Sequence, residues 1–399
     1  MTVGREKTLN DTLAKYRYLQ LAQASDNREI LHFLATVPMD TKSLTLRYSR
    51  GEDFFAFFKL QADQYFVFKF LNLDGSIGGI SVIVMRKSYI AGRPTLLGYL
   101  CDLRVSPTLN KKARLEWRKC YADILKNYRQ LKEFSGLEYF YSAILGENEL
   151  AIKALTRNKG DIIYREIQAY KAFSLLGRVP LLSSLKKQGS RYHCRFATVD
   201  DVSLLKNFLM NQSKEKAFGD YFDSEVEDDE LQRRLATWEG MKIADFILCF
   251  SAGELMGCLC PWSTKNSRKL IVDNLSLPLK ILSKMLALIG CRPIIAGEEL
   301  KILYLTHFEI KNWPTQREKE RCFTAMLDFI YLNKVQKNYH MLSFLDFSEN
   351  AFLQKVLKGK YIYQKTPALL FQVMHRDQFL EQDFLVKKNK LVSFEIGVS

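Results

Sequence analysis

The chain has 399 residues, a length that suits two domains of about 200 residues each better than a single core. Hydrophobic residues make up 47% and aromatic residues 13%, which excludes global disorder. The net charge is +15, and residues 1–190 carry most of it: they hold 30 Lys and Arg against 18 Asp and Glu, whereas residues 191–399 hold 29 against 26. An anionic ligand, a nucleic acid or plain solubility each explains such a bias.

Targeting and metal signals are missing from the sequence. The N-terminus is polar and lacks the apolar run of a signal peptide, and no stretch of about 18 apolar residues suits a membrane span. Eight cysteines lack C-x-x-C spacing and five histidines lie far apart, so we predict no disulfide framework and no metal site. We therefore expect a reduced, cytoplasmic protein that does not associate with membranes.

The first half predicts a helix capped by Asp26 and then a β-meander with a tight turn at Asp74-Gly75, a strong hairpin signal between alternating apolar runs. The remaining predicted elements are strands over 64–73, 78–89 and 95–105, a long helix over 111–134, a strand over 137–145, a short helix from Glu147 and closing strands over 162–176.

The second half repeats this order. Asp200 stands where Asp26 stood, a hairpin turns at Ala252-Gly253, and a strand, a long helix and another strand follow over 302–347. Asn148 pairs with Asn350 at an offset of 202 residues, which indicates an internal duplication. The predicted division is a first domain over 1–176, a linker over 177–190 and a second domain over 191–399.

The segment 277–290 has no counterpart in the first half. Its apolar residues cover much of a helix, with Lys280 and Lys284 on one side. We predict a helix that packs on the protein and contributes to a domain or subunit contact, rather than a membrane anchor.

Two further segments leave alternatives open. The run DFFAFFKL over 53–60 is apolar on almost every side, which is typical of core but also suits the floor of a substrate pocket. The acidic run over 223–234 either attracts a cationic amine or complements the dipole of the helix that follows it.

Residues 100–121, LCDLRVSPTLNKKARLEWRKCY, resemble the central strand, V-x-P turn and coenzyme A loop of the GNAT superfamily of acyl-CoA-dependent N-acetyltransferases. The order of elements from about residue 15 to 375 is similar to two copies of that fold. The resemblance implies an α/β (α+β) protein with two tandem GNAT-like domains, each a mostly antiparallel, splayed sheet flanked by helices. It also implies acetyl-CoA or another acyl-CoA as co-substrate, with the pantetheine between the splayed strands and the pyrophosphate at the start of the long helix, where free amides and the helix dipole favour an anion.

The loop departs from the family pattern at its glycines. Ala113 replaces the first glycine and Leu115 the last small residue, while three added cations can compensate through contacts to phosphate. The second loop, over 312–323, has drifted further and predicts a structural role. By resemblance, the expected coenzyme-binding residues are Leu103, Val105, Asn110, Lys111, Lys112, Ala113, Arg114 and Asn148.

Acyl transfer to an amine needs a base and often an acid. Asp102 on the central strand is the candidate base, with an ion pair to Arg104 as the alternative interpretation. The family's tyrosine acid is replaced by Leu155 in the first copy, so Tyr141 or Tyr139 on the preceding strand is the substitute candidate. Aromatic residues on strands also serve packing alone.

The resulting hypothesis is an acyl-CoA-dependent N-acyltransferase that transfers acetyl to a small-molecule or peptide amine. One alternative is an aminoacyl or peptidyl transferase with the same doubled fold, for which a charged tRNA explains the basic first half. A nucleic-acid partner is not favoured, because no patch interleaves aromatic and basic residues. A third alternative is a non-catalytic ligand-binding or scaffold protein, which the missing glycines support.

Overall fold

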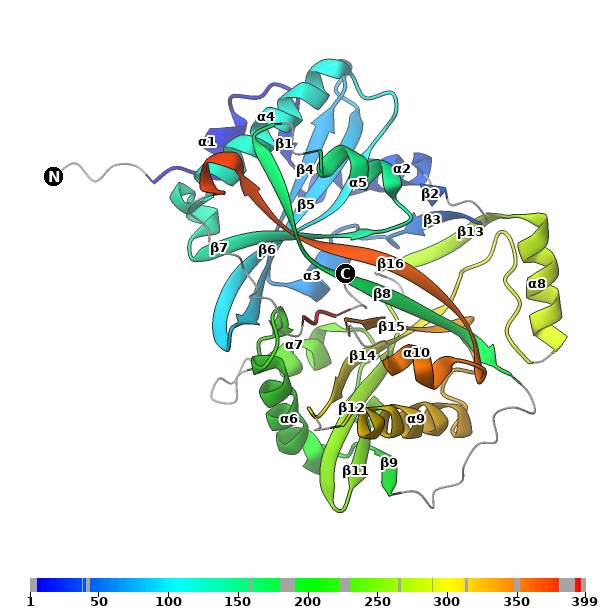
Figure 1. Ribbon diagram of the computed structural model, residues 1–399. Helices are drawn as coiled ribbons and strands as arrows, with labels where there is room; N and C mark the ends of the chain where they lie inside the picture. The colour runs from blue at the N-terminus through cyan, green and yellow to red at the C-terminus, as the bar shows by residue number, and fades with distance from the viewer. Residues whose placement is uncertain are drawn as a thin grey trace.

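The computed structural model has one long, twisted sheet at its centre, with helices of the first half at one end and helices of the second half at the other (Figure 1). The structure describes residues 6–37, 39–40, 44–157, 160–179, 191–222, 230–264, 267–288, 290–312, 315–347, 352–379 and 392–395.

The first half follows the predicted order, with short additional elements near the N-terminus. Its hairpin turns at Asp74-Gly75 as predicted, because Gly75 has a φ of +86° and the Asp74 carboxylate accepts the Ser76 amide at 3.0 Å. The elements are α1 (Leu9–Leu13), β1 (Leu19–Leu21), α2 (Asn27–Thr36), β2 (Met39–Asp40), β3 (Leu44–Ser49), α3 (Ala56–Gln61), β4 (Gln64–Leu71), β5 (Ile77–Ile90), β6 (Arg93–Val105), α4 (Lys111–Asn127), β7 (Leu137–Leu145), α5 (Glu149–Leu155) and β8 (Ile162–Arg178).

The second half also has the predicted strand, long helix and strand. Its first hairpin turns at Ala252-Gly253, where both residues have positive φ (50° and 80°). The elements are β9 (Tyr192–Phe196), α6 (Val202–Lys214), β10 (Gly219–Asp220), α7 (Glu230–Thr237), β11 (Ile247–Ser251), β12 (Glu254–Trp262), β13 (Lys269–Leu275), α8 (Leu277–Leu288), β14 (Ile302–Ile310), α9 (Gln316–Leu332), β15 (Met341–Asp346), α10 (Phe352–Leu357) and β16 (Tyr361–His375). Asn350, predicted to open the short helix, lies outside the described residues.

The turn before the first helix is similar in the two halves, with one correction to the sequence alignment. The Asp26 carboxylate accepts the Gln23 amide at 2.8 Å. In the second half Asp201, rather than Asp200, makes the equivalent contact, because its carboxylate accepts the Thr198 amide at 2.7 Å.

The last strands of the two halves are exchanged within the sheet. The strand order is β1-β4-β5-β6-β7-β16-β8-β15-β14-β12-β11-β9, with β10 paired to β5. Thus β16 of the second half lies beside β7 of the first, and β8 lies beside β15. Figure 1 shows the long strands β8 and β16 crossing the middle of the molecule. Because one sheet runs through both halves, the predicted boundaries at 176 and 191 stay predictions.

A second, smaller sheet also joins the halves. Strand β13 pairs antiparallel with β3, from Lys269 opposite Ser49 to Leu275 opposite Leu44, and β2 completes this sheet. The central hydrophobic core likewise draws side chains from both halves. Phe57 in the run over 53–60 is one of these core residues, with 3% of its surface exposed.

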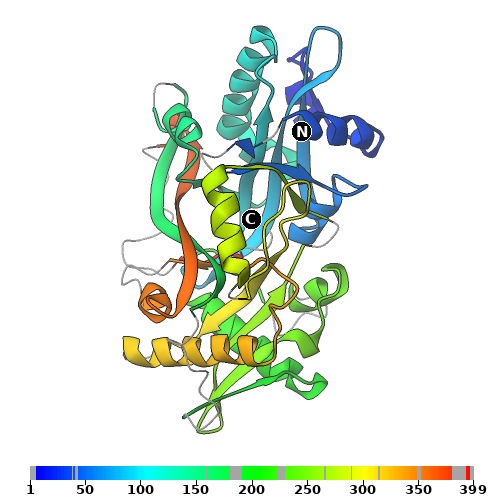
Figure 2. The same cartoon turned by 90° about the vertical axis from the view of Figure 1, so that its right-hand side faces the viewer.

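Helix α8 lies at the surface, as both views show (Figures 1 and 2). The predicted helix is confirmed, and its Leu279 packs against Val272, Leu275 and Leu300; a domain or subunit contact stays a prediction. Leu277, Ile281, Met285 and Leu288 are exposed, and Ser283 is the buried residue of this helix. None of the described helices has the length and apolar character needed to cross a membrane.

Candidate active site

The parallel strands β6 and β7 stop pairing partway along their length, and we call the region between them beyond that point the first cleft. Their pairing ends where Tyr99 lies opposite Tyr141, and the strands then diverge. At the narrow end the Ser142 hydroxyl donates a hydrogen bond to the Leu100 carbonyl at 2.9 Å. Beyond this point, as far as Val105, no described strand pairs with β6 on the side of the cleft. This is the splayed geometry that the resemblance predicted.

The second half has an equivalent opening, the second cleft, between β14 and β15. These strands pair over three residue pairs and then diverge. Residues 392–395 of the same chain lie here: the His307 amide donates to the Glu395 carboxylate at 2.8 Å. Phe394 packs edge-on against Phe347, with ring centroids 5.1 Å apart. The second cleft is therefore filled by the chain itself.

Both clefts open at a β-bulge with the same backbone conformation. In β6, Asp102 and Leu103 stand opposite the single residue Ser81, and Asp102 has a φ of +50°. In β14, His307 and Phe308 form the equivalent bulge, and His307 has a φ of +52°. A left-handed residue other than glycine costs about 1–2 kcal/mol, and such strain concentrates at functional sites. The matched bulges extend the similarity between the two halves to the centre of each cleft.

Asp102, the predicted base, pairs with two arginines. Its carboxylate contacts Arg50, and Arg104 Nε lies 3.4 Å from its second oxygen. Burial alone raises the pKa of the Asp102 carboxyl, but the charges of Arg50, Arg104 and Arg268 together outweigh burial and hold that pKa below its usual value. Asp102 is therefore ionised at neutral pH and already paired, which makes it a weak proton acceptor. Its role as base stays a prediction.

The arginine cluster, defined as Arg50, Arg104 and Arg268, surrounds Asp102 with residues from both halves. Arg50 follows β3, Arg104 lies on β6, and Arg268 directly precedes β13. The Phe57 ring lies between two of them, with the guanidinium carbons of Arg50 and Arg268 at 4.3 and 4.4 Å from its centroid. Sequence analysis did not identify Arg50 or Arg268, because neither belongs to a motif.

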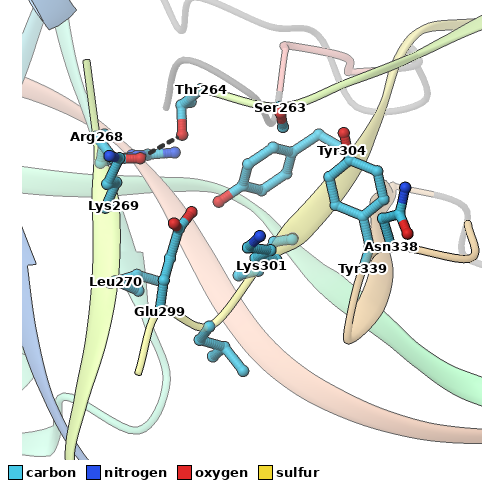
Figure 3. Close-up of a pocket in the computed structure, with 12 residues that line it drawn as sticks. Ser263, Thr264, Arg268, Lys269, Leu270, Glu299, Lys301, Tyr304, Asn338 and Tyr339 are labelled. Atoms are coloured by element: carbon cyan, nitrogen blue, oxygen red, sulfur yellow. Dashed lines mark hydrogen bonds between the residues drawn. The ribbon is translucent and has the colours of Figure 1, made fainter. Parts of the chain in front are cut away.

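A cavity of about 310 Å³, which we call the β13–β14 pocket and which residues of the second half line, adjoins this cluster and shares Arg268 with it. Figure 3 shows Arg268 and Lys269 on the β13 side of the pocket and Lys301 and Tyr304 on the β14 side. Glu299 also lines the pocket, so the charged groups facing it are three cations and one carboxylate. The volume is sufficient for a small ligand.

The loop before α4 is held together by side-chain contacts. Asn110 is the N-cap, and its side chain accepts the Ala113 amide at 2.8 Å. Arg114 turns back and donates to the carbonyls of Ser106 and Pro107 at 2.7 and 2.8 Å. Arg114 therefore stabilises the loop, and one of the predicted phosphate-binding amides is already capped.

The remaining predicted cations at this helix start face solvent. Lys111 and Lys112 are exposed, and the first amides of a helix have no partner within the helix. Leu115 is 54% exposed on the same turn, and Leu103 at the bulge is 47% exposed. The two ammonium groups and their amides are thus accessible to an anion, with apolar surface beside them.

The last two predicted residues are Tyr141 and Asn148. Tyr141 is 2% exposed, stacks on Tyr99 with ring centroids 5.0 Å apart and contacts Phe218 of the second half. Burial raises the pKa of the Tyr141 phenol, so it stays protonated. Asn148 caps α5 by accepting the Ala151 amide at 3.1 Å. Both positions fit packing and capping roles, and their functional roles stay predictions.

A buried polar group that sequence analysis did not identify surrounds His307. Burial and then the charge of Arg234 lower the pKa of the His307 imidazole, so the ring is neutral and its Nε2 can accept from Arg234 Nη1 at 3.1 Å. Burial raises the pKa of the Glu395 carboxyl, which lies 3.7 Å from Arg234. The signal that could have identified His307 was its position in the second half, which is equivalent to that of Asp102 in the first. Within the described residues, no group of three or more His, Cys, Asp or Glu is arranged to hold a metal ion.

Comparison with known proteins gives structural matches only. No family model and no curated protein matches the sequence. Saccharomyces cerevisiae N-myristoyltransferase with bound myristoyl-CoA has a TM-score of 0.55 at 10% identity, over 93% of this chain and 83% of that chain. The same enzyme with myristoyl-CoA and inhibitors gives a TM-score of 0.56 at 9% identity, over 93% of this chain and 85% of that one. A GCN5-related glucosamine N-acetyltransferase region of a fungal multi-domain GH3 beta-N-acetylglucosaminidase gives 0.55 at 11% identity, where the match covers 89% of this chain but 38% of the fungal one.

The splayed strands, the bulge and the long helix that follows it define a class of fold. This chain has the GNAT fold that the sequence predicted, and the tandem arrangement stays a prediction. Identities near 10% show the fold alone, so activity and substrates remain matters of proposal.

Proposed function

We propose that the protein is an acyl-CoA-dependent N-acyltransferase whose co-substrate, acetyl-CoA or another acyl-CoA, binds in the first cleft. The pantetheine lies along the free edge of β6, and the pyrophosphate lies at the start of α4 beside Lys111 and Lys112. The acceptor is a small-molecule or peptide amine that approaches from the side of the arginine cluster.

The observation that carries this proposal is the asymmetry between the two clefts. The second cleft is filled by residues 392–395, whereas no described strand pairs with β6 beyond Tyr99 on the side of the first cleft. Two exposed lysines stand at the helix start that the first cleft leads to, but the second loop places Glu318 and Glu320 in the corresponding part of α9. An anionic coenzyme therefore favours the first copy.

The bulge supplies the chemistry in this proposal. Because Asp102 and Leu103 leave the regular ladder, a backbone N–H at this point is available to polarise the thioester carbonyl as charge develops on its oxygen. The amine attacks the carbonyl carbon, a proton leaves the amine nitrogen, and the coenzyme departs as a thiol. Positioning of the two reactants contributes the rest of the rate. Asp102 remains the proposed base, and Tyr141 the proposed acid.

The test is calorimetric titration with acetyl-CoA and myristoyl-CoA at two salt concentrations. We expect one site per chain and an affinity that falls with salt, because the lysine contacts are exposed. Lys112→Glu exchanges an attraction for a repulsion and is expected to weaken binding at least about tenfold, or about 1.4 kcal/mol.

Arg317→Glu is the matched control, since Arg317 is exposed and is the second residue of α9 as Lys112 is of α4. It should leave the affinity unchanged. An equal loss in both variants would move the coenzyme away from α4. No heat with either coenzyme at millimolar concentration would refute the proposal and favour a non-catalytic protein that keeps the fold.

A further inference from the structure

The arginine cluster holds more positive charge than the aspartate inside it can neutralise. The exposed fractions are 3% for the Arg50 side chain, 13% for Arg104 and 10% for Asp102. Arg268 adds a third guanidinium, so these four side chains carry a net charge of two positive units. A buried guanidinium with unused hydrogen-bond donors is costly, and proteins retain one where a ligand supplies the counter-charge.

Arg50 also has hydrogen-bond donors that are not used. One of its terminal nitrogens contacts Asp102, but Nε and Nη1 are buried and have no acceptor among the residues that the structure describes. Its guanidinium lies over the rings of Phe57 and Tyr48, at 4.3 and 5.4 Å from their centroids. Aromatic rings cover the face of a guanidinium and leave its N–H edge unpaired. The edge is therefore free for an oxyanion.

The β13–β14 pocket extends this positive region to the surface. Arg268 belongs to the cluster and to the pocket, and Lys269 and Lys301 line the pocket on either side (Figure 3). Glu299 is the carboxylate that faces them. A ligand in this pocket meets an excess of cations, and Arg268 is the group through which it reaches the cluster around Asp102 at the bulge.

We propose that the acceptor amine carries an oxyanion, a carboxylate or a phosphate, which binds in the β13–β14 pocket through Arg268, Lys269 and Lys301, with its charge also balanced by Arg50. This inference rests on the proposed function and specifies its substrate class. Guanidinium groups bind both oxyanions in a bidentate manner, which explains why the cluster uses arginines. When the oxyanion of the acceptor is bound in this pocket, its amine is oriented toward the thioester at Asp102 and Leu103.

The first experiment measures binding without turnover. Succinate and inorganic phosphate are titrated into the full-length protein, and the shift in thermal midpoint and the heat of binding are recorded. We expect saturable binding of at least one of the two probes, at least tenfold weaker in Arg268→Gln and in Lys301→Gln. Lys301→Gln, in a half-buried residue at the pocket wall, keeps the test valid if Arg268→Gln folds poorly. Arg129→Gln is the control and should bind like wild type, because Arg129 is exposed and lies in the short turn of helix that follows α4.

The second experiment compares acceptors. Glycine, β-alanine, γ-aminobutyrate and phosphoethanolamine are each paired with the matching neutral amine, and thiol release from acyl-CoA is followed. We expect an acidic amine to exceed its neutral partner at least tenfold in kcat/KM, and Lys301→Gln to reduce that preference. The three carboxylate acceptors and phosphoethanolamine together distinguish a carboxylate site from a phosphate site.

The failures of the two proposals are distinguishable. Turnover with neutral amines equal to turnover with acidic ones, or probe binding that is the same in all variants, overturns the present inference and leaves the acyltransferase. If neither acyl-CoA binds, the proposed function falls, and the acceptor role of the pocket falls with it even where succinate binds.

Discussion

The contact between residues 392–395 and the second cleft can be tested by shortening one side chain, that of Phe394. Phe394 is 9% exposed and packs on two rings, Phe347 at 5.1 Å and Tyr170 at 5.3 Å between centroids. Replacement by alanine leaves a cavity between strands of both halves, since Tyr170 lies on β8. Buried Phe→Ala changes cost about 3–5 kcal/mol. We expect a value near the lower limit for Phe394→Ala, because a chain end relaxes into a cavity more easily than a strand does.

The measurement is urea unfolding, with the free energy of unfolding obtained by linear extrapolation. Phe379→Ala is the control, since Phe379 is 39% exposed and should cost less than half as much. A free energy of unfolding for Phe394→Ala within about 0.5 kcal/mol of wild type would refute the docking of this segment. Binding of two acyl-CoA molecules per wild-type chain would likewise contradict a second cleft filled by the chain.

Two further predictions concern buried and exposed groups in the second half. Because burial raises the pKa of the Glu395 carboxyl above its unfolded value, the folded state binds more protons between those two values, and stability falls as pH rises through them. Urea unfolding over a pH series should show this slope in wild type and lose it in Glu395→Gln. On α8, Met285→Ser and Leu288→Ser remove side chains that are 60% and 88% exposed, so each should change the free energy of unfolding by less than about 0.5 kcal/mol; a larger loss would mean that these side chains are covered, as in a subunit contact.

Local chemistry made much of the fold predictable. The Asp74-Gly75 and Ala252-Gly253 turns fix two hairpins because glycine takes positive φ at low cost. Apolar periodicity and length marked the long helices, and the order of these elements predicted the GNAT fold. Each of these signals lies within a short window of sequence.

Non-local pairing could not be predicted in the same way. The strands β8 and β16 are long and largely apolar, and nothing in either sequence distinguishes a partner in its own half from one in the other. The same limit applies to the candidate site. Asp102 was found from a motif, but Arg50 and Arg268 reach it only because β3 and β13 pair across the halves. The exposure of α8 also depended on tertiary structure, because an amphipathic pattern does not state what covers it.

The role of Asp102 can be decided by Asp102→Asn, which keeps the shape of the side chain and removes its charge. The variant leaves Arg50, Arg104 and Arg268 without their carboxylate, and loss of one partner from a buried ion pair costs about 3–5 kcal/mol. If Asp102 neutralises the cluster, succinate should bind more tightly to the variant than to wild type and restore part of the lost stability. The pKa of Asp102 lies below its usual value because the arginines outweigh burial, so its contribution to stability is present at neutral pH and is lost only in acid.

A role as base predicts a different result for the same variant. The rate of acyl transfer would then fall by about two to four orders of magnitude, with saturating acyl-CoA and unchanged coenzyme affinity. Asp102 as a positioning residue instead predicts a changed KM for the acidic amine and a pH profile of kcat/KM with the same shape as wild type. A variant that matches wild type in stability, with and without succinate, would contradict the neutralising role and with it the argument that the arginine cluster awaits an anion.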